Sequence, residues 1–173
     1  MKPLNLFFAI SLLINISIAA QDSIQWPDPA VVKLANSKLP ASLEKFNFLE
    51  SYADFKKRDI KHDQDEIVED GFHVVFKKSK AKGVQKVVLF FSFFGTIEKE
   101  EDKDNCNLTG MEITFKTKKD CDEYLKTLGK PTEDDESRWE FLLNKDDSCK
   151  GCQVIRDGDN VIRMFAMDGC GGG

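Results

Sequence analysis

Five cysteines are the residues of this chain best suited to chemistry, and all of them follow residue 105. Two of them form the pair Cys149-Lys150-Gly151-Cys152. A pair with this spacing acts as a redox site when a helix N-terminus lowers the pKa of the first thiol. It could also join Cys170 and a further ligand in a metal site, although structural zinc sites usually show two ligand pairs. We favour structural disulfides, because the pair precedes a predicted strand and has no second ligand pair.

A predicted hairpin near the end of the sequence indicates the first disulfide. Its turn chemistry lies in Asp157-Gly158-Asp159-Asn160, a combination typical of tight turns. With Gly158 and Asp159 as the two turn residues, Cys149 and Cys170 lie nearly opposite each other. A disulfide needs a Cα separation of about 4.4–6.8 Å, which such a pair satisfies. We therefore predict a bond between Cys149 and Cys170.

The second predicted disulfide joins Cys106 to Cys121. Cys121 lies on the buried face of a predicted helix, and Cys106 precedes the strand that leads into that helix. Because five is an odd number, one thiol is left over. Cys152 takes that place in the predicted register, facing Phe165, as a free or redox-active thiol.

No other group of residues forms a recognisable catalytic pattern. His62 lies in a charged segment, and His73 alternates with apolar residues in a predicted strand. The sequence has no nucleophile elbow and no phosphate-binding glycine loop. Asp102, Asp104 and Asn107 approach calcium-ligand spacing, but the expected glycine and closing glutamate are missing. We predict no catalytic residue, no metal and no cofactor.

Two acidic segments are the predicted partner-facing surface. Charge complementarity with a basic partner would raise the association rate. The residues assigned to this surface are Glu98, Glu100, Glu101, Asp102, Glu133, Asp134, Asp135 and Glu136.

Apolar periodicity defines the elements that must hold these residues in place. Helical spacing predicts helices over residues 29–39, 42–55 and 117–128, and alternation or apolar runs predict strands over 72–76, 87–94, 111–115, 139–143, 152–157 and 161–167. The run from Val87 to Phe94 is apolar at nearly every position, which is typical of a strand covered on both faces. Residues 56–70 are charged throughout and are predicted to form a helix end and loop. The expected fold is α+β: an antiparallel sheet of about six strands, with two N-terminal helices and one inserted helix on one face.

The segment from Thr117 to Leu143 resembles modules of the β-lactamase-inhibitor-like and outer-membrane assembly lipoprotein type. Its helix is followed by Gly129-Lys130-Pro131, an acidic loop and the strand residues Trp139 and Phe141. The order of elements also resembles cone-shaped folds of the nuclear-transport-factor-like kind. The resemblance covers less than a third of the chain after residue 20 and assigns no functional residue.

The first twenty residues predict export. Lys2 precedes an apolar run from Leu4 to Ile18, and Ala19 and Ala20 form a small-residue cleavage site. This order is typical of a secretory signal peptide, and the run is shorter than a comfortable membrane span. We expect residues 21–173 to be one secreted or periplasmic α+β domain with a flexible glycine tail, in a compartment where disulfides persist.

Composition restricts the function of that domain. Apolar residues make up 41% of the chain, as in globular proteins. Loss of Lys2 changes the net charge of −5 to −6, and an acidic domain is a poor candidate for binding nucleic acid or an anionic membrane. The leading hypothesis is a non-enzymatic binding protein that acts through a protein surface, such as an inhibitor or immunity-type protein, with a basic protein as its partner. The alternatives are a thiol-disulfide oxidoreductase using Cys149 and Cys152, and a small-molecule carrier with a phenylalanine-lined cavity against the sheet.

Overall fold

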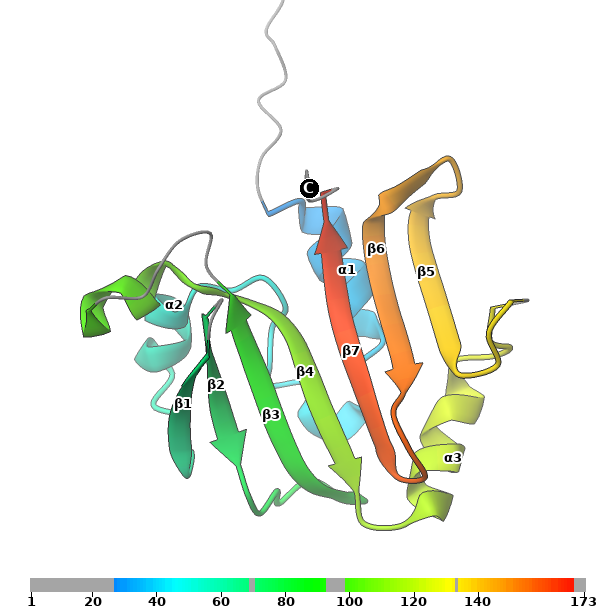
Figure 1. Ribbon diagram of the computed structural model, residues 1–173, viewed down its shortest axis with the longest axis horizontal. Coiled ribbons are helices and arrows are strands. Elements are labelled where there is room, and N and C mark those ends of the chain that lie inside the picture. The colour runs from blue at the N-terminus through cyan, green and yellow to red at the C-terminus, as the bar shows by residue number, and fades with distance from the viewer. Residues whose placement is uncertain (1–26, 69–70, 93–98, 133, 170–173) are drawn as a thin grey trace, which may run out of the picture.

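A mixed α+β structure is formed by residues 27–68, 71–92, 99–132 and 134–169, which the computed structural model describes (Figure 1). The strands of its seven-stranded antiparallel sheet are β1 (Gln64–Val68), β2 (Gly71–Phe76), β3 (Val84–Ser92), β4 (Asn107–Phe115), β5 (Arg138–Asn144), β6 (Asp147–Arg156) and β7 (Val161–Asp168). The other elements are the helices α1 (Pro29–Ser37), α2 (Tyr52–Lys57) and α3 (Lys118–Thr127), and the 3₁₀ turns η1 (Ala41–Leu43) and η2 (Glu100–Asn105). Among the described residues, no helix has the length and apolar character needed to cross a membrane.

The sheet is built from two antiparallel meanders that meet in its middle. Its strand order is β1-β2-β3-β4-β7-β6-β5. After β4, helix α3 carries the chain past two strand positions to the far edge, where β5 begins. The chain then returns inward, and β7 pairs with β4 from Gly110↔Phe165 to Thr114↔Val161. The last strand therefore links the two halves.

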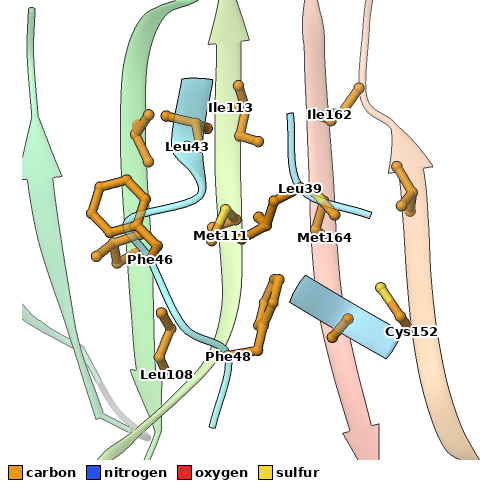
Figure 2. Close-up of a cluster of buried hydrophobic side chains, with 14 of the residues drawn as sticks. Leu39, Leu43, Phe46, Phe48, Leu108, Met111, Ile113, Cys152, Ile162 and Met164 are labelled. Atoms are coloured by element: carbon orange, nitrogen blue, oxygen red, sulfur yellow. The ribbon is translucent and has the colours of Figure 1, made fainter. Parts of the chain in front are cut away.

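The helices pack on one face of the sheet, as the sequence predicts. Val31 and Ala35 of α1 are buried in the same core as Tyr124 and Leu125 of α3. The Tyr124 hydroxyl donates a 2.7 Å hydrogen bond to the carbonyl oxygen of Lys38, just after α1. Figure 2 shows the layer between: Leu39, Leu43, Phe46 and Phe48 point from the N-terminal segment toward the sheet residues Leu108, Met111, Ile113, Cys152, Ile162 and Met164.

Local capping signals correctly predict α1 and α3. The Asp28 side chain accepts a 2.9 Å hydrogen bond from the backbone N–H of Ala30 at the start of α1. At the start of α3, the Thr117 hydroxyl oxygen accepts a hydrogen bond from the N–H of Asp120. These caps satisfy backbone donors that a helix leaves open at its first turn.

The predicted second helix over residues 42–55 is wrong. The chain forms η1, an irregular segment, and then the short α2, capped by Ser51. Leu49 has a φ of 63°, which interrupts a right-handed helix. The N–H of Leu49 donates to the carbonyl of Leu108, and the N–H of Leu108 donates to the carbonyl of Glu50. Pairing with the beginning of β4 thus replaces intrahelical hydrogen bonding.

The sheet has seven strands rather than six, because residues 64–68 form β1 within the segment predicted as a loop. Four of its five residues are exposed, so its sequence lacks the apolar alternation of the other strands. Five residue pairs with β2, from Gln64↔Val75 to Val68↔Gly71, hold these residues in an extended strand. The strand forms at the edge of the sheet, where charged side chains are common.

Candidate binding surface

None of the described helices packs on one face of the sheet, and we refer to this face as the open face. In Figure 1 the strands lie in front of α1, so this face points toward the viewer. Residues paired in register form one row across all seven strands of this face: Glu66, His73, Phe90, Gly110, Phe165, Gln153 and Glu140. The row has an aromatic centre with a carboxylate at each end.

Gly110 leaves space for two aromatic rings at the centre of this row. A Cβ atom at residue 110 would lie 2.7 Å from the Phe165 ring and 3.0 Å from the Phe90 ring. The two rings are stacked at 30° with centroids 6.2 Å apart, and the Phe90 ring lies 4.7 Å from the His73 ring. An aromatic side chain that covers a glycine in a neighbouring strand also stabilises the sheet. We call His73, Phe90 and Phe165 the aromatic platform.

Two shallow hollows adjoin the aromatic platform. Each contains His73, Phe90 and Phe165 in its lining, and their volumes are 430 and 410 Å³. The larger hollow also has apolar walls from Val75 and Val88, and its charged rim consists of Glu66, Lys77, Lys86, Glu112 and Arg163. Within that rim, Arg163 lies 3.3 Å from Glu112.

His73 is half-buried in this surface, and burial lowers its pKa. The carboxylates of Glu66 and Glu112 partly oppose this effect, whereas the Lys86 ammonium adds to it. The imidazole is therefore neutral at neutral pH. It contributes a flat ring and a polar edge, a combination that suits a protein interface.

The two residues between Cys149 and Cys152 contribute to the fold. Lys150 lies 2.8 Å from the carboxylate of Asp28, the cap of α1, and its hydrogen bond is the main reason that the pKa of Asp28 is lowered. A Cβ atom at Gly151 would lie 2.2 Å from the carbonyl oxygen of Phe141. The close approach of β5 therefore explains why residue 151 is a glycine. No role of Gly151 in thiol chemistry is needed to explain it.

We expect Gly151→Ala to lower the free energy of unfolding by about 1–3 kcal/mol, since an added methyl group forces β5 and β6 apart. Urea denaturation followed by circular dichroism measures this change. Ser148→Ala, at an exposed position of the same strand, is the control and should change stability by less than about 0.5 kcal/mol. Equal stabilities of the two variants would contradict the close approach.

Cys152 is a fully buried free thiol. This burial argues against the redox interpretation of the Cys149–Cys152 pair. Burial raises its pKa to about 12, whereas reactive thiols have lowered pKa values. Cys152 pairs with Ala166, and the predicted pairing with Phe165 is wrong. The turn is centred on Asp159, because Arg156 pairs with Ile162, and this one-residue difference changes which residues share a face.

The predicted disulfide between Cys106 and Cys121 is wrong, since both residues are free, buried thiols. Cys106 precedes β4 and Cys121 lies in the first turns of α3, which follows β4. A nine-residue strand spans roughly 30 Å, far more than a disulfide bridges. Cys149 is disulfide-bonded, but its predicted partner Cys170 lies outside the described residues, so that pairing stays a prediction for peptide mapping without reduction.

The three free cysteines should react with iodoacetamide far more slowly in the native protein than in concentrated guanidinium chloride. Each side chain is fully buried, and burial raises the pKa of all three thiols. Mass spectrometry of the alkylated protein should find three labels only after unfolding. Rapid labelling of Cys152 in the native state would contradict its burial.

The two predicted acidic segments lie at different edges of the sheet, so they do not form one surface. The η2 turn contains Glu101 and Asp102 and lies beside α2, near β1, whereas residues 134–136 precede β5 at the other edge (Figure 1). Asp102 accepts a hydrogen bond from the Lys99 N–H, and Asp135 accepts two from Ser137. Glu98, Glu133 and the side chain of Glu100 lie outside what the structure describes.

Sequence reasoning missed the aromatic platform. Its residues come from β2, β3 and β7, and the pairing of these strands is not encoded by local spacing. The only local signal is the alternation that separates Phe90 from Phe91. Comparison of the chain with family models, curated proteins and solved structures found no match.

Proposed function

We propose that this chain is an exported binding protein that recognises another protein through the aromatic platform. The observation that carries the proposal is a group of three neighbouring aromatic rings on the sheet face that no described helix covers. Protein interfaces characteristically have an aromatic centre and a polar rim. Here Glu66 and Glu140 end the central row, and Arg163 and Glu112 lie beside it.

The platform replaces the acidic segments as the proposed contact surface. Those segments lie at separate edges of the sheet, and two of their carboxylates are engaged in local hydrogen bonds. A basic partner is still compatible with the carboxylates of Glu66 and Glu140. The partner is expected to place an apolar side chain on Phe90 and Phe165, with polar groups at the rim.

Other observations argue against the two alternative functions. The burial and raised pKa of Cys152 do not support thiol-disulfide exchange. The phenylalanines of the helix-covered face pack against one another: Phe72, Phe91 and Tyr52 have ring centroids about 5 Å apart. These three rings therefore fill the core, and the 540 Å³ hollow beside α3 is lined by only one phenylalanine, Phe115.

Site-specific photocrosslinking in the native compartment tests the proposal. A benzophenone side chain at residue 165 should capture one defined protein, and the same group at Lys126, an exposed position of α3, should not. The captured protein, once purified, should bind the unmodified chain in calorimetry. The double variant Phe90→Thr/Phe165→Thr should weaken that binding at least about tenfold, as expected for central interface residues.

The matched control is Ile67→Thr/Leu143→Thr, which removes two exposed apolar side chains from the edge strands. It should bind the partner as the unmodified chain does. Equal loss in both double variants, or crosslinking at residue 126 to the same extent as at 165, would contradict recognition through the aromatic platform.

A further inference from the structure

Six lysines lie together at the end of the sheet where β2 turns into β3 and β4 leads into α3. We call them the lysine cluster: Lys77, Lys78, Lys80, Lys82, Lys86 and Lys116. The Lys116 N–H donates a 2.9 Å hydrogen bond to the carbonyl of Gly83, which holds the two connections side by side (Figure 1). Lys86 lies on the adjacent part of β3, paired with Thr114.

None of these six lysines forms an ion pair with a described residue. Residues 77–86 contain five lysines and no acidic residue, although the whole chain has a net charge of −5. Carboxylates also border the cluster: Asp63 accepts from the Lys77 N–H, Asp120 accepts from the Thr117 hydroxyl, and Glu66 and Glu112 line the same hollow as Lys77 and Lys86. Five of the six side chains are exposed, and Lys86 is half-buried. The cluster is therefore a local basic surface on an acidic protein.

The N-terminus of α3 adds positive potential at the same place. This helix has ten residues and begins with Lys118 and Lys119, which the N-cap Thr117 separates from Lys116. A helix N-terminus carries partial positive charge, so lysines in the first turn oppose the helix dipole. Lys118 pairs with Asp122 and Asp159, Lys119 pairs with Glu123, and Asp120 is the acidic residue of the first turn. The partial positive charge of the helix N-terminus adds to the attraction of the neighbouring lysines for anions.

We infer that the lysine cluster is a docking surface for a linear sulfated polysaccharide. Short lysine-rich runs such as Lys77-Lys78-Ser79-Lys80-Ala81-Lys82 are typical of heparin-binding patches. Lysine presents a flexible point charge, which suits a polymer with repeated sulfate groups. This inference does not depend on the aromatic platform, although Lys77 and Lys86 also rim its larger hollow.

The composition of the cluster favours a polysaccharide over a membrane or a nucleic acid. The exposed large apolar side chains of the described residues are Ile67, Val68 and Leu143, none of which belongs to it. It therefore has no side chain to insert into a bilayer. No arginine or aromatic residue belongs to the cluster itself. The nearest rings, His73, Phe90 and Phe165, are half-buried in the adjoining hollow. Arg163 there is paired with Glu112 and Asp157, so stacking on nucleic-acid bases is disfavoured.

Calorimetry with a heparin dodecasaccharide at physiological ionic strength tests this inference. The cluster variant Lys77→Gln/Lys78→Gln/Lys80→Gln/Lys82→Gln should bind at least about tenfold more weakly than the unmodified chain. The slope of log K against log salt concentration should fall by about one for each lysine removed. The charge-matched control is Lys33→Gln/Lys126→Gln/Lys130→Gln/Lys145→Gln, which removes four exposed lysines elsewhere and should bind within about twofold of the unmodified chain.

Circular dichroism establishes that both variants are folded. The inference is overturned if the unmodified chain does not bind heparin, if the control loses as much affinity as the cluster variant, or if desulfated heparin binds equally well. Tighter binding to phosphatidylserine vesicles or to double-stranded DNA at the same ionic strength would also overturn it.

Discussion

Replacing Phe91 by alanine should lower the free energy of unfolding by about 3–5 kcal/mol, because it removes a fully buried ring from the core. Phe91 is stacked on Phe72 with an interplanar angle of 7° and makes edge contacts with Tyr52 and Phe55. The cavity left by alanine would adjoin three aromatic rings, which cannot easily move to fill it. Urea or thermal denaturation measures the loss.

Phe90→Ala is the control, since Phe90 is the neighbouring residue on the opposite face of β3. Its half-buried ring lies on the open face, so its loss should destabilise the protein by about 1 kcal/mol, within the usual range for partly exposed sites. Equal effects at residues 90 and 91 would contradict the assignment of the two faces.

The stability of the protein should fall by up to about 4 kcal/mol between pH 9 and pH 12 because of Cys152. Burial raises the pKa of this thiol from 9.0 to about 12 in the folded state, with Lys38 opposing the shift. Above pH 9 the unfolded chain loses the Cys152 proton while the folded chain keeps it. The unfolded state then binds fewer protons, so stability decreases as the pH rises.

Denaturation curves at several pH values measure this effect. Cys152→Ala cannot ionise, so its stability should decrease less steeply over the same interval. A smaller decrease should persist in that variant, because burial also raises the pKa of Cys106, Cys121 and Tyr124. Identical slopes of stability against pH in the variant and the unmodified chain would contradict the raised pKa of the Cys152 thiol.

Elements with local signals were predictable, and elements that depend on distant partners were not. Thr117, with an apolar stripe behind it, correctly indicates α3. Leu43, Phe46 and Leu49 have the spacing of a helix, yet Leu43 ends the 3₁₀ turn η1, and Phe46 and Leu49 reach the core from the irregular segment that pairs with β4. Apolar spacing does not distinguish a helix from an irregular segment here, because either structure would bury the same side chains.

The prediction that both faces of β3 are covered also depends on distant residues. Its apolar run is consistent with burial of both faces, and Val88 is indeed only 6% exposed. No described helix covers that face, however, and Lys86, Glu112 and Arg163 line the hollow beside Val88. The aromatic platform follows from the register of β2, β3, β4 and β7, which local sequence does not specify.

The net charge of the whole chain does not reveal the basic surface, because it averages over basic and acidic segments. A net charge of −5 for the whole chain argues against anionic partners, but charge acts over about 8 Å at physiological ionic strength. Residues 77–86 are basic on that scale, and the acidic η2 turn lies at the other end of β3. Charge in windows of ten residues would have revealed the lysine cluster from the sequence.

The central position of β7 delays completion of the fold until the end of the chain is made. Until Val161–Asp168 leaves the ribosome, the inner edge of β4 has no neighbour and the β5–β6 hairpin has nothing to join. We expect a nascent chain that lacks β7 to hold two sets of strands that are not yet joined. A nonsense mutation before residue 161 would leave the inner edge of β4 open, and an open strand edge is prone to aggregation.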